Sequence, residues 1–223
     1  MLNYVVDPTI VAPLVPSGTE IDFENGETFL SVVGFLFLDT RLLGLPIPLH
    51  RDFEEVNLRF YVRKKSADTW RRGVVFVREM VPRRAIATIA RTFYGEPYLA
   101  VPMKHDIDHA DSKLSVEYSW RRGTKWESLK MSASGEAQTI PSGSHAEFIT
   151  EHYWGYTCFR GGCSEYRVEH PRWKVWNADS FEFKADVPAL YGEQFVEPLS
   201  VAPRSAFIAD GSPVLVYSAR RLD

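Results

Sequence analysis

Glycine and proline interrupt this chain too often for long helices to form. Fourteen residues of each type are spread over 223 positions, and both disfavour the interior of a helix. Between these interruptions the chain is rich in aromatic and β-branched residues, which favour strands. The sequence therefore predicts a mainly antiparallel β fold, in the β-rich α+β class, with a few short helices.

Short segments of alternating or apolar character predict the strands of this fold. They are Thr28–Leu38, Glu54–Arg63, Gly73–Glu79, Tyr98–Met103, Lys113–Arg121, Thr124–Ala133, Arg167–Val175, Ser180–Lys184 and Val214–Tyr217. Hairpin turns are expected at Ser119–Thr124 and Cys158–Cys163. The polar stretch Lys104–Asp111 is interpreted as a solvated loop. No repeat or linker divides the chain, so we expect a single domain over residues 1–223.

Two segments have the spacing of amphipathic helices instead. After Pro82, the segment Arg83–Phe93 places its apolar residues on one stripe. A second helix is expected to begin at a serine N-cap, either Ser142 or Ser144. Glu147 would complete a capping box with Ser144, and the helix should end near Tyr156.

Composition argues against several classes of protein. The net charge is −3, with 26 basic and 29 acidic residues, so we expect no nucleic-acid partner. The pairs Arg71–Arg72 and Arg121–Arg122 are interpreted as solvated charges in turns. The apolar runs are too short to span a membrane, and the first ten residues do not resemble an export signal. These features predict a cytoplasmic protein that has no membrane partner.

The sequence offers no common motif for a metal, a nucleotide or a nucleophile elbow. Two cysteines, Cys158 and Cys163, are too few for a disulfide framework, and we expect reduced thiols, although a cross-strand disulfide also fits their spacing. The histidines His145, His152 and His170 would have to converge to bind a metal, whereas capping or packing is the simpler interpretation. We therefore predict no metal and no cofactor.

A row of polar side chains on one strand is the most informative feature. In Phe53–Val62 the residues Glu55, Asn57, Arg59 and Tyr61 share one face, while apolar residues occupy the other. An antiparallel sheet often exposes such a polar face to water. The same four groups would also suit the wall of a cleft that holds a small polar ligand. Spacing alone leaves both interpretations open.

Four blocks of sequence resemble a known family. The segments FEEVNLRFYV, RRAIATIARTFYGEPYLAVPM, FITEHYWGYT and VEHPRWKVWNA are similar, in order and spacing, to the YqjF-like family. This bacterial family of unknown function is placed within the acetoacetate decarboxylase-like superfamily. The resemblance implies curved antiparallel sheets that close into a cone or barrel around an internal cavity, with a few short helices outside.

The decarboxylases carry a pattern Arg-Glu-x-x-x-x-Pro-Lys-Lys, which this chain matches only in part. Arg91 and Pro97 occupy the arginine and proline positions, but Tyr98 and Leu99 replace both lysines. One of those lysines forms the Schiff base on which decarboxylation depends, so the resemblance implies a pocket without its nucleophile. Glu55 resembles the acidic position of the superfamily on the earlier strand.

We therefore expect an internal pocket that binds a small oxygenated or carboxylated molecule through Glu55, Asn57, Arg59, Arg91 and Tyr98. One alternative is a structural or interaction protein whose cavity is filled by side chains. Another is a lyase or hydrolase that uses Glu55 and Tyr98. Lys104 is a further candidate amine, but it lies in the stretch interpreted as solvated. The sequence is compatible with an oligomer and names neither the ligand nor a reaction.

Overall fold

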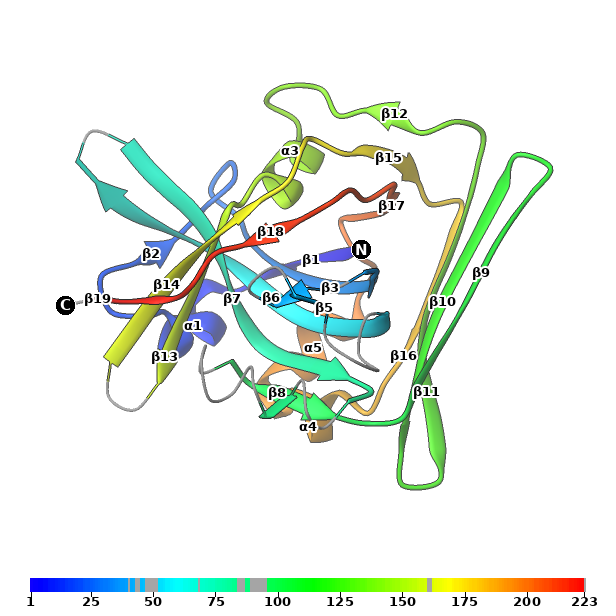
Figure 1. The fold of residues 1–223 in the computed structure, drawn as a ribbon, viewed down its shortest axis with the longest axis horizontal. Coiled ribbons are helices and arrows are strands. Elements are labelled where there is room, and N and C mark those ends of the chain that lie inside the picture. The colour runs from blue at the N-terminus through cyan, green and yellow to red at the C-terminus, as the bar shows by residue number, and fades with distance from the viewer. Residues whose placement is uncertain are drawn as a thin grey trace.

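The computed structural model describes residues 1–39, 41–42, 45–46, 52–67, 69–83, 87–88, 96–159 and 162–222. Within these residues a 13-stranded sheet forms the centre of the fold (Figure 1). Its main path follows the order β12 (Gln138–Thr139), β15 (Lys174–Asn177), β17 (Ser205–Ala209), β1 (Leu2–Val6), β3 (Thr28–Phe37), β6 (Phe53–Ser66), β7 (Thr69–Val81), β13 (Trp154–Phe159), β14 (Gly162–Glu169) and β18 (Leu215–Val216).

Further strands extend this sheet and build two smaller ones. Off the main path, β2 (Glu20–Ile21) pairs with β6, β8 (Tyr98–Ala100) with β7, and β19 (Arg220–Leu222) with β14. A four-stranded sheet follows the order β16 (Ser180–Lys184), β11 (Lys125–Ser134), β10 (Lys113–Arg122) and β9 (Met103–Ala110), and it stands at one side of the molecule (Figure 1). A two-stranded sheet joins β4 (Arg41–Leu42) and β5 (Leu45–Pro46).

The described helices are short, as the sequence predicts. They are α1 (Pro8–Val11), α3 (His145–Thr150), α4 (Val187–Leu190) and α5 (Val196–Ser200), with 3-10 turns at Ala12–Leu14 and Glu193–Phe195. The predicted N-cap of α3 is confirmed, because the Ser144 hydroxyl accepts a hydrogen bond from the Glu147 amide at 3.3 Å. The predicted helical end near Tyr156 is wrong. The chain leaves the helix after Thr150 and enters β13, whose backbone pairs with both β7 and β14.

Strand β6 is buried on both of its faces, which fixes its position at the centre of the fold. Its apolar face joins the larger core, where Leu58 and Phe60 are fully buried. The opposite face carries Tyr61, which is also fully buried and packs in a second core with Phe148 and Ile149 of α3. The helix therefore covers the face of the sheet that an isolated strand would present to water.

The mainly antiparallel β architecture is confirmed, but two further local predictions are wrong. Lys104–Asp111 is not a loop, because Met103–Ala110 forms strand β9. Its side chains are mostly exposed and polar, so no alternation marks it as a strand. The predicted strand Arg167–Val175 is interrupted at 170–173, where Pro171 cannot donate a backbone hydrogen bond.

The arginine pair in β7 also differs from its interpretation as solvated turn charges. Arg71 pairs with the fully buried carboxylate of Glu165 at 2.8 Å, and Arg72 pairs with the buried Asp22 at 2.6 Å. Both arginines lie on a strand that crosses the molecule, so their charges neutralise buried carboxylates. The predicted helix Arg83–Phe93 lies mostly outside the described residues, of which 87–88 are helical.

Candidate functional site

The polar row of β6 meets two neighbouring strands inside the protein. Asn57 stands opposite Glu79 of β7, and Glu79 in turn stands opposite Tyr98 of β8. The exposed fractions of Glu55, Asn57 and Glu79 are 2%, 1% and 2%. The interpretation of this row as a solvated face is therefore wrong for Glu55 and Asn57. Register across three strands gathers these groups into one buried cluster.

Hydrogen bonds fix the carboxyl group of Glu55 in this cluster. The Tyr98 hydroxyl donates to one carboxyl oxygen at 2.9 Å, and the Asn57 side-chain amide donates to the other at 3.0 Å. Three of the five predicted ligand-binding residues thus lie in direct contact. Tyr98 occupies the position where the decarboxylase pattern has a lysine, and its phenol reaches the acidic group by a hydrogen bond without bringing a positive charge.

Two further residues complete the cluster and were missed in the sequence. Glu96, just before β8, and Tyr166 of β14 are buried, with exposed fractions of 4% and 8%. The Tyr166 ring lies so close to β13 that a Cβ added at Gly155 would meet it at 2.1 Å, so only glycine fits there. In the sequence, this part of the site is marked by Pro97, which follows Glu96 and matches the decarboxylase pattern, and by the predicted strand that ends at Glu79.

The cluster contains several carboxyl groups, and burial favours their protonated, uncharged form near neutral pH. Desolvation raises the pKa of Glu55 to about 7, against which hydrogen bonds from Asn57 and Tyr98 act. Burial likewise raises the pKa of Glu96 to about 8, and the Tyr166 hydroxyl opposes this rise. The pKa of Glu79 is raised well above its usual range by burial and by the charges of Glu96 and Glu55. Carboxyl groups in this state can donate as well as accept hydrogen bonds.

Arg59 lies on the same strand but turns toward helix α3. The pairing of β6 with β7 is irregular between Leu58 and Arg59, and the Arg59 guanidinium donates to the backbone oxygen of Ile149 at 3.2 Å. It also lies over the Tyr61 ring, 5.6 Å from its centroid. Its positive charge lowers the pKa of Glu55, although burial remains the larger effect. Arg59 therefore flanks the cluster, and the fifth predicted ligand-binding residue, Arg91, lies outside the described residues.

Several buried polar atoms at this site have no hydrogen-bond partner among the described residues. They are the Asn57 side-chain oxygen, one carboxyl oxygen of Glu79 and the Arg59 Nε atom. Buried polar atoms are nearly always paired in folded proteins, because leaving one unpaired costs about 1–3 kcal/mol. Unpaired buried polar atoms also occur elsewhere in the described chain, for example at Thr28 and Tyr191, but here they lie beside several buried carboxyl groups.

The other residues raised by the sequence lie elsewhere. Lys104 is exposed on β9, with its ammonium 4.8 Å from the centre of the Trp126 ring. His170 stacks on Trp173 at 4.1 Å, and His152 lies 3.1 Å from Asp22. In the part of the chain that the structure describes, no three His, Cys, Asp or Glu side chains are arranged to hold a metal ion.

The cysteines face each other across the predicted hairpin and are both free thiols. Burial and a hydrogen bond with Cys163 raise the pKa of Cys158 to about 11, which disfavours the reactive thiolate. Two open grooves of about 730 and 590 Å³ lie beside the four-stranded sheet. The residues that line these grooves do not include the buried carboxyl cluster.

The fold is that of the acetoacetate decarboxylase-like proteins. The acetoacetate decarboxylase of Legionella pneumophila superposes with a TM-score of 0.55 at 12% identity, over 99% of this chain and 79% of that one. An acetoacetate decarboxylase-like enzyme from Sphingomonas wittichii gives 0.57 at 14% identity, over 98% and 85% of the two chains. The enduracididine biosynthesis enzyme MppR, complexed with pyruvate, gives 0.60 at 13% identity, over 99% and 83%.

The sequence places the chain within this class more narrowly. The model of the DUF2071 family, described as an uncharacterized conserved protein, matches residues 1–218, and the chain belongs to this family. It is 30% identical to the uncharacterized protein YqjF of Bacillus subtilis over 182 residues, which cover 80% of this chain and 72% of YqjF. No helix among the described residues is long and apolar enough to cross a membrane.

Proposed function

We propose that the protein binds a small oxygenated molecule at the buried cluster of Glu55, Asn57, Glu79 and Tyr98. The observation that carries this proposal is the set of buried polar atoms that lack partners beside carboxyl groups of raised pKa. A carbonyl or hydroxyl oxygen can accept from a protonated carboxyl or a phenol, and a hydroxyl can also donate to Asn57. A purely apolar ligand would leave these atoms unpaired.

The charges around the cluster restrict the class of ligand further. Glu55, whose pKa is about 7, is partly ionised at neutral pH and would repel a carboxylate placed directly against it, so a carboxylated ligand needs a cation beside its carboxylate. Arg59, whose Nε atom is unpaired within the described chain, is the group that supplies it. A small 2-oxo acid satisfies both requirements, with its keto oxygen toward Tyr98 and its carboxylate toward Arg59. The fold relative MppR holds pyruvate, which makes pyruvate the first ligand to test.

A binding experiment separates this proposal from a filled interior. We expect millimolar pyruvate or acetoacetate to raise the melting temperature of the protein, because a ligand that binds only the folded state stabilises it. Acetate at the same concentration is the control for ionic strength and for the carboxylate alone. If no oxygenated acid raises the melting temperature, the cluster is a filled structural core and the proposal fails.

Single-residue variants test which side chains contact the ligand. Tyr98→Phe removes one hydroxyl and should abolish the ligand-induced shift, while Tyr217→Phe removes an exposed hydroxyl bonded to Glu169 and should leave it intact. Arg59→Lys keeps the positive charge but loses the planar guanidinium, so it should weaken pyruvate more than a neutral ketone such as acetone. An equal loss with both ligands would contradict the assignment of the carboxylate to Arg59.

A second candidate function is proton transfer at the carbon beside a carbonyl group. A general base works best when its pKa lies near the working pH, and burial places the pKa of Glu55 at about 7. Glu55 would accept the proton while the Tyr98 hydroxyl donates to the carbonyl oxygen. Incubation of pyruvate in deuterium oxide tests this, since catalysis would replace its methyl protons by deuterium. If deuterium exchange is no faster with the wild-type protein than with Glu55→Gln, Glu55 does not catalyse proton transfer and only the binding proposal stands.

A further inference from the structure

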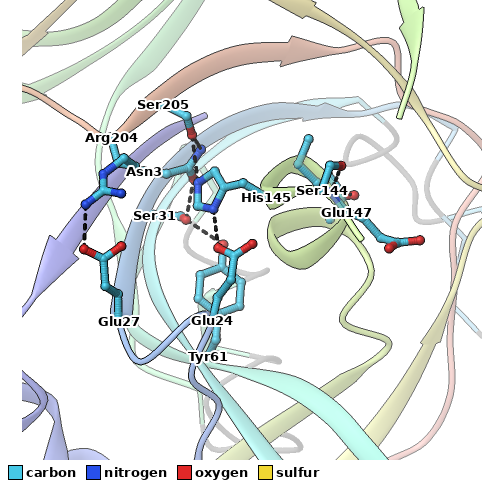
Figure 2. A network of polar contacts seen from close by, with 12 residues as sticks. Asn3, Glu24, Glu27, Ser31, Tyr61, Ser144, His145, Glu147, Arg204 and Ser205 are labelled. Atoms are coloured by element: carbon cyan, nitrogen blue, oxygen red, sulfur yellow. Dashed lines mark hydrogen bonds and ion pairs between the residues drawn. The ribbon is translucent and has the colours of Figure 1, made fainter. Parts of the chain in front are cut away.

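A second polar network lies outside the carboxyl cluster, where β17, helix α3 and the turn before β3 meet (Figure 2). The Ser205 hydroxyl lies 3.0 Å from the Nε2 atom of His145. The Nδ1 atom of the same ring is paired with the carboxylate of Glu24. A serine, a histidine and a carboxylate are therefore connected in the order that a nucleophile, its base and the group that orients the base require.

The backbone holds each of these side chains in place. Glu24 and Glu27 exchange backbone hydrogen bonds of 3.0 and 2.9 Å across a tight turn, where Gly26 adopts a φ of 83°. His145 is the first residue of α3, directly after its N-cap, and its ring packs on Phe29 at 4.7 Å between centroids. Ser205 begins β17, where it pairs with Asn3 of β1. Three rigid elements thus set the geometry of the network.

The hydrogen bonds also decide where the protons lie. The Asn3 side-chain amide donates to the Ser205 oxygen at 2.8 Å, so the serine hydroxyl is free to donate its own proton to His145. Asn3 is held in this orientation because its side-chain oxygen accepts from Ser31 at 2.6 Å. Since the carboxylate of Glu24 can only accept, Nδ1 carries a ring proton, and in the neutral imidazole Nε2 then presents its lone pair to the serine. This is the tautomer that a histidine base needs.

We propose that Ser205, His145 and Glu24 form a hydrolytic site for small carboxylic esters. The Ser205 oxygen attacks the ester carbonyl carbon while its proton passes to Nε2 of His145, and the resulting imidazolium is stabilised by Glu24. The bond to the alkoxide then breaks, the alkoxide takes this proton from Nε2 and leaves as an alcohol, and the acyl group remains on the Ser205 oxygen. Water, deprotonated by the same Nε2 atom, cleaves the acyl group as a carboxylic acid and restores the serine hydroxyl.

The surroundings of the network fit an ester presented from the surface. The side chains of His145 and Glu24 are 26% and 14% exposed, so they are sheltered but open on one side. Arg204, next to the nucleophile, is half exposed and pairs with Glu27 at 2.6 Å, which places a polar rim beside the serine. A structural role is the competing explanation, because the same contacts join β1, β17 and α3.

Covalent labelling distinguishes the two roles. A fluorophosphonate reacts with an activated serine by forming a P–O bond and releasing fluoride, and peptide mass mapping locates the adduct. We expect one adduct per chain at Ser205 and hydrolysis of p-nitrophenyl acetate above the rate in buffer. Ser205→Ala should abolish the adduct and lower kcat/KM by at least about 100-fold. Ser180→Ala, which removes an exposed hydroxyl that lies 2.8 Å from the Ser132 hydroxyl, should change neither the adduct nor kcat/KM.

Two further variants keep the proposal open to refutation if Ser205→Ala unfolds the protein. Glu24→Gln retains the size of the side chain and should lower kcat about tenfold or more, with little change in KM. In Ser205→Cys, the introduced thiol should be alkylated by iodoacetamide faster than the same thiol in a background with His145→Ala. The absence of an adduct at Ser205 in the folded wild-type protein, or esterase activity that survives Ser205→Ala, would overturn the proposal.

Discussion

Replacing Glu55 by glutamine should make the protein less sensitive to alkaline pH. The pKa of Glu55 is raised from 4.5 to about 7 by burial in the folded protein. Between these two values the folded state binds the proton more tightly than the unfolded chain does. The free energy of unfolding therefore falls as the pH rises through this window, and the loss is complete once Glu55 is ionised in the folded state as well. Glutamine has no proton to lose, so the variant lacks this contribution.

The size of the effect follows from the shift in pKa. Each pKa unit corresponds to about 1.36 kcal/mol, so the ionisation of Glu55 costs about 3 kcal/mol, most of it between pH 5 and pH 9. The amide of Glu55→Gln can still accept from Asn57 and donate to the Tyr98 oxygen, so the variant keeps the contacts of the carboxyl group. Removing the charge of Glu55 also lowers the pKa of Glu79, and this further reduces the loss of stability of the variant as the pH rises.

Urea unfolding followed by tryptophan fluorescence measures this difference at pH 5, 7 and 9. Relative to the wild-type protein, we expect the free energy of unfolding of the variant to rise by about 2–3 kcal/mol from the lowest to the highest pH. Glu136→Gln is the control, because it makes the same substitution at a solvent-exposed position. A difference between Glu55→Gln and wild type that stays constant with pH, or that shrinks as pH rises, would refute the reasoning.

Three further outcomes are expected. Gly155→Ala should lower the free energy of unfolding by about 3 kcal/mol in urea titrations, because the added Cβ would meet Tyr166 at 2.1 Å; a neutral effect would show that the ring can move. Ser144→Ala should cost about 1 kcal/mol in the same assay, since the Glu147 amide loses its cap, and an unchanged midpoint would contradict that role. Acetoacetate with borohydride should leave the intact mass unchanged, because Lys104 is exposed on β9; a stoichiometric adduct on Lys104 would overturn this.

The strand that carries the site could be predicted from the sequence, but not its surroundings. Alternation over Phe53–Val62 predicts a strand with one apolar and one polar face, and this is what β6 shows. Whether the polar face meets water depends on what packs over it. Here Phe148 and Ile149 of α3 do so from about ninety positions further along the chain, as the contact between Arg59 and Ile149 illustrates. No local pattern encodes such a packing partner.

The remaining members of the cluster could not be read from the sequence for a related reason. Glu79 joins the site only because the register of β6 with β7 places it opposite Asn57. Tyr98 joins through a parallel pairing of β7 with β8, which three residues of β8 form. Tyr98 was proposed from its alignment with the decarboxylase pattern, whereas Glu79 had no such guide. Ser205 lies outside every strand and helix predicted from the sequence, so its contact with His145 depends wholly on the fold.

The residue at position 98 affects the pKa values of the buried carboxyl groups. An ammonium at position 98 would lie within hydrogen-bond reach of Glu55 and would favour its ionised form. The phenol of Tyr98 supplies a hydrogen bond without a charge. Burial therefore remains the largest effect on the pKa of Glu55 and of Glu79 and raises both, although the Tyr98 hydrogen bond acts against it. Without an ammonium at position 98, burial favours the protonated form of these carboxyl groups near neutral pH. Such groups are better suited to donating a proton or a hydrogen bond to a neutral oxygen than to pairing with a bound cation.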